Sequence, residues 1–166
     1  MESYYEQQKF NKWYIWVVLS IPFIIFLFGA ITGKMQGEEQ HSMLIANVIV
    51  AFVFVLFIFT KLETRIDELG ITIRFFPFQR VYYYVKWEDV ESCSVRTYKP
   101  LREYGGWGLR YSFKNGKAYN VAGTKGLQLV LKSGNKFLIG TQNNKELSSF
   151  LDQLKTKHGI TAIEVG

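Results

Sequence analysis

Two uninterrupted apolar stretches occupy most of the first 60 residues, at positions 13–32 and 43–60. Neither stretch contains a charged side chain. An α-helix rises about 1.5 Å per residue, so about 20 apolar residues cross the roughly 30 Å hydrocarbon core of a bilayer. The pattern therefore predicts two transmembrane helices, at 13–32 and 43–60, joined by a short polar loop at 33–42.

The charges that flank these stretches predict their orientation. Lys9 and Lys12 precede the first stretch, and Lys61 and Arg65 follow the second, whereas the loop between them carries only Lys34. Positive charge is enriched on the cytoplasmic side of membrane proteins. We therefore expect a two-pass protein of the plasma (inner) membrane, with a cytoplasmic N-terminal segment at 1–12, an external loop at 33–42 and a cytoplasmic C-terminal part.

The interior of the two stretches argues against conduction. Conducting and transporting proteins carry ionisable groups at membrane depth, and none is present here. Asn47 is polar, but a packing contact between two helices is the expected role for an isolated asparagine. The aromatic residues Trp13, Tyr14 and Trp16 stand where an interfacial belt is expected. A pore is thus less favoured than an anchor.

From residue 61 the pattern changes to short β-branched and aromatic runs separated by turn residues. These runs predict about seven antiparallel strands. Asn115-Gly116 and Gly134-Asn135 mark tight hairpin turns. A longer loop containing glycine and proline is expected at 99–108. Eight runs are candidates for these strands, at 62–67, 71–76, 81–87, 91–98, 109–113, 117–121, 127–133 and 135–141.

One helix is expected after the strands. Asn143 is a helix-capping residue, and Glu146 stands three positions later, where it can reach back to the cap. Apolar residues then recur at helical spacing, which predicts a helix with one face packed on the sheet. They are Leu147, Phe150, Leu151 and Leu154. Gly159 ends this helix, leaving residues 158–166 as a tail that is either a short extra strand or frayed.

The order of these segments resembles a known family. The runs at 87–95, 107–110, 117–121, 126–129 and 137–141 are similar to those of small bacterial membrane proteins that carry a bacterial PH-like domain. The resemblance covers residues 61–157 and implies a mainly-β, PH-like barrel with a C-terminal helix, placed after a two-helix transmembrane hairpin. Most members of that family have no assigned activity, so the resemblance implies a fold rather than a reaction.

Charge is distributed unevenly along the 166 residues. The formal net charge is +6. Residues 1–60 carry three lysines against four glutamates, whereas residues 61–166 carry 17 Lys and Arg against 10 Asp and Glu. A basic domain tethered to a membrane gains about 1 kcal/mol per cation near an anionic lipid surface. The alternative is that these charges only solvate the domain.

Several basic and aromatic residues are candidates for binding lipid headgroups or a partner protein. Arginine forms paired hydrogen bonds with phosphate, and aromatic rings favour the membrane interface. PH domains that bind inositol lipids usually place cations in their first hairpin turn, but here that turn, 67–70, is acidic. Attraction to anionic lipid in general stays open. The candidates are Arg74, Arg80, Lys99, Arg102, Tyr104, Trp107 and Arg110.

The sequence shows few features of an enzyme. The glycines at 105–108 lack the spacing of a dinucleotide loop, and no metal-binding set of Cys and His is present. Cys93 is the only cysteine and is expected to be structural. We therefore predict a non-enzymatic membrane protein without cofactors, whose PH-like domain binds a protein partner or itself. Anionic-lipid binding is the alternative, and nucleic acid is disfavoured.

Overall fold

The computed structural model describes residues 2–10, 13–32 and 37–164. They form two compact units, Phe10–Thr60 and the combination of Met1–Lys9 with Lys61–Gly166. The predictions that concern Lys12, Lys34 and the side chain of Tyr14 lie outside the described residues.

The first unit consists of two helices, α1 (Trp13–Ile31) and α2 (Glu38–Phe59). Their contact includes Trp16 and Phe54, whose ring centroids are 4.9 Å apart. Among the described residues, α2 is long and apolar enough to cross a membrane, and the apolar stretch Ile15–Ile31 is shorter. Because α2 begins at Glu38, the polar residues 38–42, which we expected in the loop, are helical. Asn47 is buried, and its amide donates to the Met43 carbonyl at 2.9 Å.

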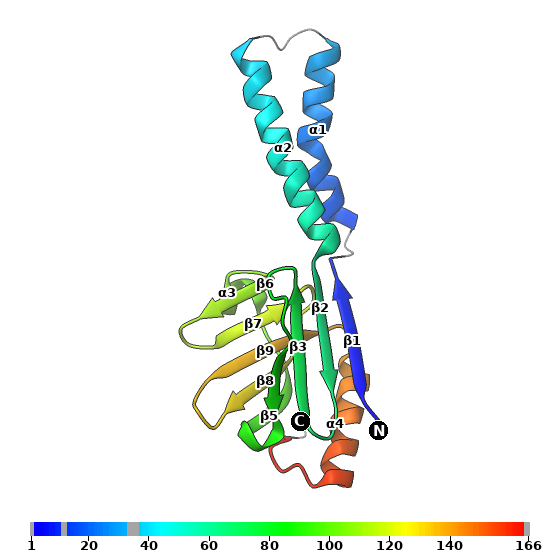
Figure 1. Ribbon diagram of the computed structural model, residues 1–166, viewed down its shortest axis with the longest axis vertical. Helices are drawn as coiled ribbons and strands as arrows, with labels where there is room; N and C mark the ends of the chain where they lie inside the picture. The colour runs from blue at the N-terminus through cyan, green and yellow to red at the C-terminus, as the bar shows by residue number, and fades with distance from the viewer. Residues whose placement is uncertain (1, 11–12, 33–36, 165–166) are drawn as a thin grey trace. The chain divides into compact units, whose positions relative to one another are not determined.

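The second unit begins with a strand that the sequence did not predict. Residues Tyr4–Lys9 form β1, which pairs antiparallel with β2 (Lys61–Ile66). β3 (Gly70–Phe76) and β4 (Tyr83–Lys86) complete a four-stranded sheet in the order β1-β2-β3-β4. Figure 1 shows β1, β2 and β3 side by side. Lys9 lies opposite Lys61. The chain therefore leaves this sheet for residues 10–60 and returns to it at a directly neighbouring position.

The remaining strands form a second sheet. All of its neighbours are antiparallel except β7 and β9, which run parallel. The described strands thus form two mostly antiparallel sheets rather than the closed barrel that we expected. The sheet order is β5 (Val90–Thr97), β8 (Lys125–Leu131), β9 (Lys136–Thr141), β7 (Gly116–Asn120) and β6 (Gly108–Ser112). A 3-10 turn, η1 (Trp87–Asp89), connects β4 to β5.

The hydrophobic core lies between the facing surfaces of the two sheets. Strand alternation directs Ile71, Ile73 and Phe75 of β3 to one side, and each is at most 1% exposed. From the second sheet, Leu129 and other alternating residues are equally buried. Full burial of each such side chain contributes about 1.5–3 kcal/mol relative to exposure.

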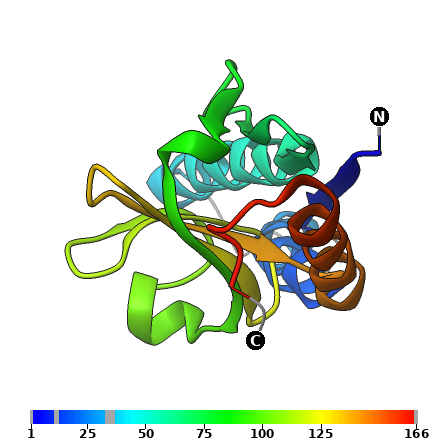
Figure 2. The same cartoon turned by 90° about the horizontal axis from the view of Figure 1, so that it is seen from below.

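The predicted C-terminal helix is present as α4 (Asn144–His158), preceded by Asn143 at the cap position. The Asn143 amide contacts the Glu146 carboxylate, side chain to side chain. Three leucines of the predicted apolar face, Leu147, Leu151 and Leu154, are buried. Figure 2 shows α4 beside β1, and Tyr4 of β1 packs against Phe150 at 6.0 Å between ring centroids.

The chain then returns to the second sheet. Ile163 forms an isolated parallel bridge with Cys93 of β5, and the Cys93 amide donates to the Ala162 carbonyl at 2.7 Å. The segment after α4 therefore pairs as a short extra strand at its described end. Cys93 is fully buried, and this burial raises the pKa of its thiol.

Candidate functional site

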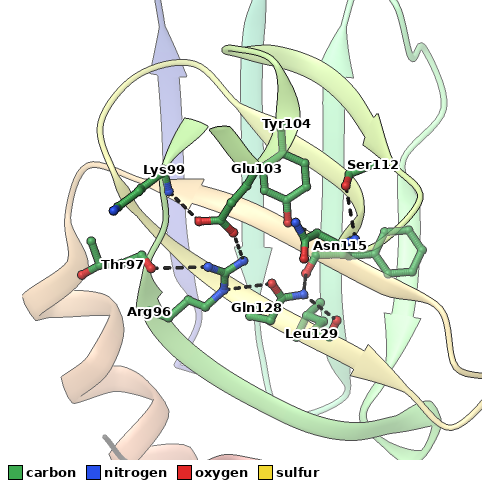
Figure 3. A network of polar contacts seen from close by, with 10 residues as sticks. Arg96, Thr97, Lys99, Glu103, Tyr104, Ser112, Asn115, Gln128 and Leu129 are labelled. Atoms are coloured by element: carbon green, nitrogen blue, oxygen red, sulfur yellow. Dashed lines mark hydrogen bonds and ion pairs between the residues drawn. The ribbon is translucent and has the colours of Figure 1, made fainter. Parts of the chain in front are cut away.

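The predicted loop at 99–108 contains a short helix, α3 (Pro100–Tyr104). A polar network holds it to the second sheet (Figure 3). The Glu103 carboxylate accepts hydrogen bonds from the Lys99 backbone N–H at 2.6 Å and from the Arg96 guanidinium at 2.8 Å. Arg96 also donates to the Gln128 side chain of β8 at 3.0 Å. Partial burial opposes ionisation, but these donors outweigh it and hold the pKa of Glu103 below its ordinary value.

Tyr104 is part of the core rather than of the surface. It is 5% exposed and packs with Tyr98, Ala118 and Leu138. The Tyr98 and Tyr104 rings meet edge to face at 6.2 Å between centroids. Burial raises the pKa of the Tyr104 hydroxyl, which donates to the Asn115 carbonyl at 3.3 Å. The ring fastens α3 to the sheet and is turned away from solvent.

Four of the predicted residues are exposed and lie in or close to α3 along the chain. Lys99, Arg102 and Arg110 are exposed, and none of the three forms an ion pair within the described residues. Arg110 donates to the Trp107 carbonyl at 2.9 Å. The Trp107 indole is 37% exposed and donates to the Gly123 carbonyl at 3.0 Å. Lys99, Arg102 and Arg110 thus expose three cations, and Trp107 one aromatic ring, along the segment that contains α3.

Arg74 belongs to a different place, the outer face of the first sheet. Its guanidinium bonds the Glu63 carboxylate at 2.7 Å through Nε and lies 4.2 Å from the centre of the Tyr82 ring. Lys61 pairs with the same carboxylate at 2.7 Å. Arg80 is exposed in the loop between β3 and β4. The seven predicted residues therefore do not form one site.

Glu63 gives the first testable prediction. Its side chain is 6% exposed, and although burial opposes ionisation, Lys61, Arg74 and Tyr82 hold its pKa below the ordinary 4.5. A lowered pKa in the folded state means that the stabilisation is complete above pH 4.5 and is lost as the pH falls through the lower folded value. We expect Glu63→Gln to lower the free energy of unfolding by about 2 kcal/mol at pH 7.

The measurement is thermal unfolding of the detergent-solubilised chain at pH 7 and at pH 3. The difference between wild type and Glu63→Gln should shrink at the lower pH. The exposed pair Lys86–Glu88, at 3.0 Å, supplies the control, since Glu88→Gln should change stability little at either pH. An equal effect of Glu63→Gln at both pH values would contradict the role assigned to the carboxylate.

A more open site lies where the second sheet extends past the first. Cross-strand partners share a face, so Phe137, Lys117 and Tyr111 form one row, and Ile139, Tyr119 and Leu109 form the next. Exposure rises along both rows toward the edge. Phe137 is 6% exposed and Tyr111 63%, while Tyr119 is 4% exposed and Leu109 41%. β4 is the last strand of the first sheet, and on this face Leu109 and Tyr111 of β6 are exposed.

This uncovered face borders a groove of about 440 Å³. We call it the lysine–aromatic groove and define it by Tyr83, Tyr111, Phe113, Lys114, Lys117, Lys136 and Phe137. Tyr83 of β4 meets Phe137 at 5.3 Å between ring centroids and forms one wall. Phe113 is fully exposed. The three lysines are exposed and form no ion pair within the described residues.

The sequence did not indicate this groove, although its turns were predicted. Lys114 and Lys117 flank the Asn115-Gly116 turn, and Lys136 follows the Gly134-Asn135 turn. The two turns come together because β7 and β9 pair in parallel, with Lys117 opposite Phe137. Exposed aromatic residues beside both turns were the available signal.

In the part of the chain that the structure describes, no group of three or more His, Cys, Asp or Glu side chains is placed to hold a metal ion. Comparison with known proteins found no protein-family model and no curated protein sequence that matches the chain.

Proposed function

We propose that this chain is a non-enzymatic integral membrane protein that presents a PH-like interaction domain at the cytoplasmic face of the plasma membrane. Residues 13–32 and 43–60 cross the bilayer as a hairpin. Support comes from the pairing of β1 with β2, because strands that share backbone hydrogen bonds must lie on the same side of a bilayer. The cations Lys9, Lys61 and Arg65 favour the cytoplasm as that side.

The domain binds a protein partner or a second copy of the chain through the lysine–aromatic groove. The observation that carries this proposal is the lysine–aromatic groove itself, where the exposed rings of Tyr111 and Phe113 lie beside Lys114, Lys117 and Lys136. β4 and β6 are the last strands of their sheets. An extended segment that pairs with β4 would continue the first sheet over Leu109 and Tyr111. Acidic residues on that segment would meet the three lysines.

Photo-cross-linking in native membranes tests this use of the groove. A photoreactive phenylalanine at Phe113 should give a discrete cross-linked product, and Lys114→Glu with Lys117→Glu should abolish it by reversing the charge. The same probe at Leu69, which is 64% exposed on the β2–β3 turn, is the matched control. Equal cross-linking from both positions, or none from Phe113, would contradict the proposal.

Binding of anionic lipid is the alternative, and the observation in its favour is the exposed surface of Lys99, Arg102 and Arg110 around α3, where none of the three forms an ion pair with another described residue. Sedimentation with acidic and neutral vesicles separates the two functions. Lipid binding through this surface requires a preference for acidic vesicles that Arg102→Ala with Arg110→Ala removes. The groove variants would leave that preference in place.

A further inference from the structure

The loop between β3 and β4 carries two apolar side chains that are mostly exposed, although the Phe78 ring also packs against the core residue Phe75 at 6.0 Å between ring centroids. Phe78 is 61% exposed and Val81 77% exposed, and the exposed Arg80 stands between them. The loop nonetheless has a defined conformation. The Gln79 backbone N–H donates to the Phe75 carbonyl at 2.7 Å, and the Gln79 amide donates to the Val81 carbonyl at 3.0 Å. These hydrogen bonds fix the loop while Phe78 and Val81 keep most of their surface exposed.

Strand register locates this loop within the domain. Lys61 is paired with Lys9 on one side and with Phe76 on the other, so these three residues form the last row of the first sheet. Residues 10–60 leave from that row and return to it. Phe78 follows Phe76 by two residues. Chain order alone thus puts the loop at the end of the sheet from which the apolar segment departs.

The chemistry of the loop matches the interfacial region of a bilayer. Aromatic rings concentrate at the level of the lipid headgroups, and arginine buries its aliphatic stem while its guanidinium reaches phosphate. Phe78 and Val81 supply apolar surface, and Arg80 supplies the cation. No ion pair of Arg80 exists within the described residues. A protein partner would have to approach the row from which the apolar segment departs.

We propose that the loop at 77–82 inserts Phe78 and Val81 into the headgroup region of the bilayer that holds residues 10–60, with Arg80 bound to lipid phosphate. This inference rests on the proposed membrane insertion. It gives the domain a second attachment besides the covalent one and so restricts its tilt against the membrane.

Single cysteines carrying an environment-sensitive fluorophore test the insertion in the full-length chain, reconstituted in vesicles with headgroup-attached quenchers. Cys93 is fully buried and does not compete for the label. Phe78→Cys should lose most of its emission to the lipid-bound quencher. Leu69→Cys should keep its emission, because the β2–β3 turn lies about 20 Å away along the strands and the headgroup region is roughly 5–8 Å thick.

A third position separates failure of this inference from failure of the proposed function. Val48 lies in α2 and is 63% exposed. A label at Val48→Cys should be protected from a water-soluble quencher if the helix is inserted. Protection at Val48 with no lipid quenching at Phe78 overturns the inference and leaves the membrane topology intact. Loss of protection at Val48 overturns both.

Discussion

Residues 61–166 expressed alone are expected not to fold, whereas the same residues joined to residues 1–9 through an Asn-Gly turn are expected to form a stable domain. Lys9 and Lys61 lie directly opposite each other at the end of β1 and β2. A two-residue Asn-Gly turn connects strands in that register. The connection replaces residues 10–60 and restores the sheet without the apolar segment.

The expected loss is large because β1 is attached to the rest of the domain by several buried groups. Tyr4 is 4% exposed, and the 2% exposed Gln8 donates to the Gly140 carbonyl at 2.6 Å. The Glu6 carboxylate accepts from the Thr141 hydroxyl and from the Gln142 backbone N–H, both at 2.7 Å. Burial of one tyrosine and three such hydrogen bonds together contribute about 4 kcal/mol or more.

A domain of this size has about 5–15 kcal/mol of total stability, so the loss of β1 removes a large share of it. Circular dichroism during heating is the measurement. The joined chain should unfold in one cooperative transition, and the fragment 61–166 should show none. Cooperative unfolding of the fragment at the temperature of the joined chain would contradict the assignment of β1 to this sheet.

Gly116→Ala is expected to destabilise the domain by about 3 kcal/mol or more. Gly116 has a φ of +76°, where a residue with a Cβ is disfavoured by about 1–2 kcal/mol. A Cβ at this position would also lie 2.1 Å from the backbone carbonyl oxygen of Lys136. That oxygen cannot move aside without separating β7 from β9, so the two effects add.

Gly134→Ala provides the matched control. Gly134 has a φ of +82°, but a Cβ there would have no heavy atom within 4 Å. Its substitution should lower the free energy of unfolding by about 1–2 kcal/mol, because only the positive φ disfavours a residue with a Cβ there. Denaturant unfolding of the joined domain measures both variants. Equal destabilisation by the two substitutions would show that the close contact between a Cβ at position 116 and the Lys136 carbonyl oxygen adds nothing to the loss of stability.

Local pattern was enough to predict most elements of the domain. The alternating runs within 71–76 and 127–133 correspond to β3 and β8, and the helical spacing after Asn143 corresponds to α4. These elements are defined by contacts between near neighbours and by one buried face. The arrangement as two sheets, with a parallel β7–β9 pair, depends on pairings between distant segments that a single sequence does not specify.

β1 and the lysine–aromatic groove show the same limit. The segment Tyr4–Lys9 is short and polar, and its partner β2 begins beyond the whole apolar segment. The groove is assembled from Tyr83, from the turn beside Gly116 and from the turn beside Gly134, which are far apart in the chain. Tyr104 was expected at the surface because it stands among exposed cations, but its ring fills the space beneath α3.

The position of β1 ahead of the apolar segment and of β2 behind it also affects biosynthesis. Roughly 50 residues separate the two strands. Because the ribosome adds about 5–20 residues per second, β2 is synthesised several seconds after β1. During that time Tyr4 and Gln8 have no sheet to join. In the proposed topology, closure of the sheet happens only after both helices are inserted and Lys61 has returned to the side of Lys9. In that topology the domain folds only when insertion of both helices is complete. A chain with only one helix inserted keeps an unfolded domain, which cytoplasmic proteases can cleave.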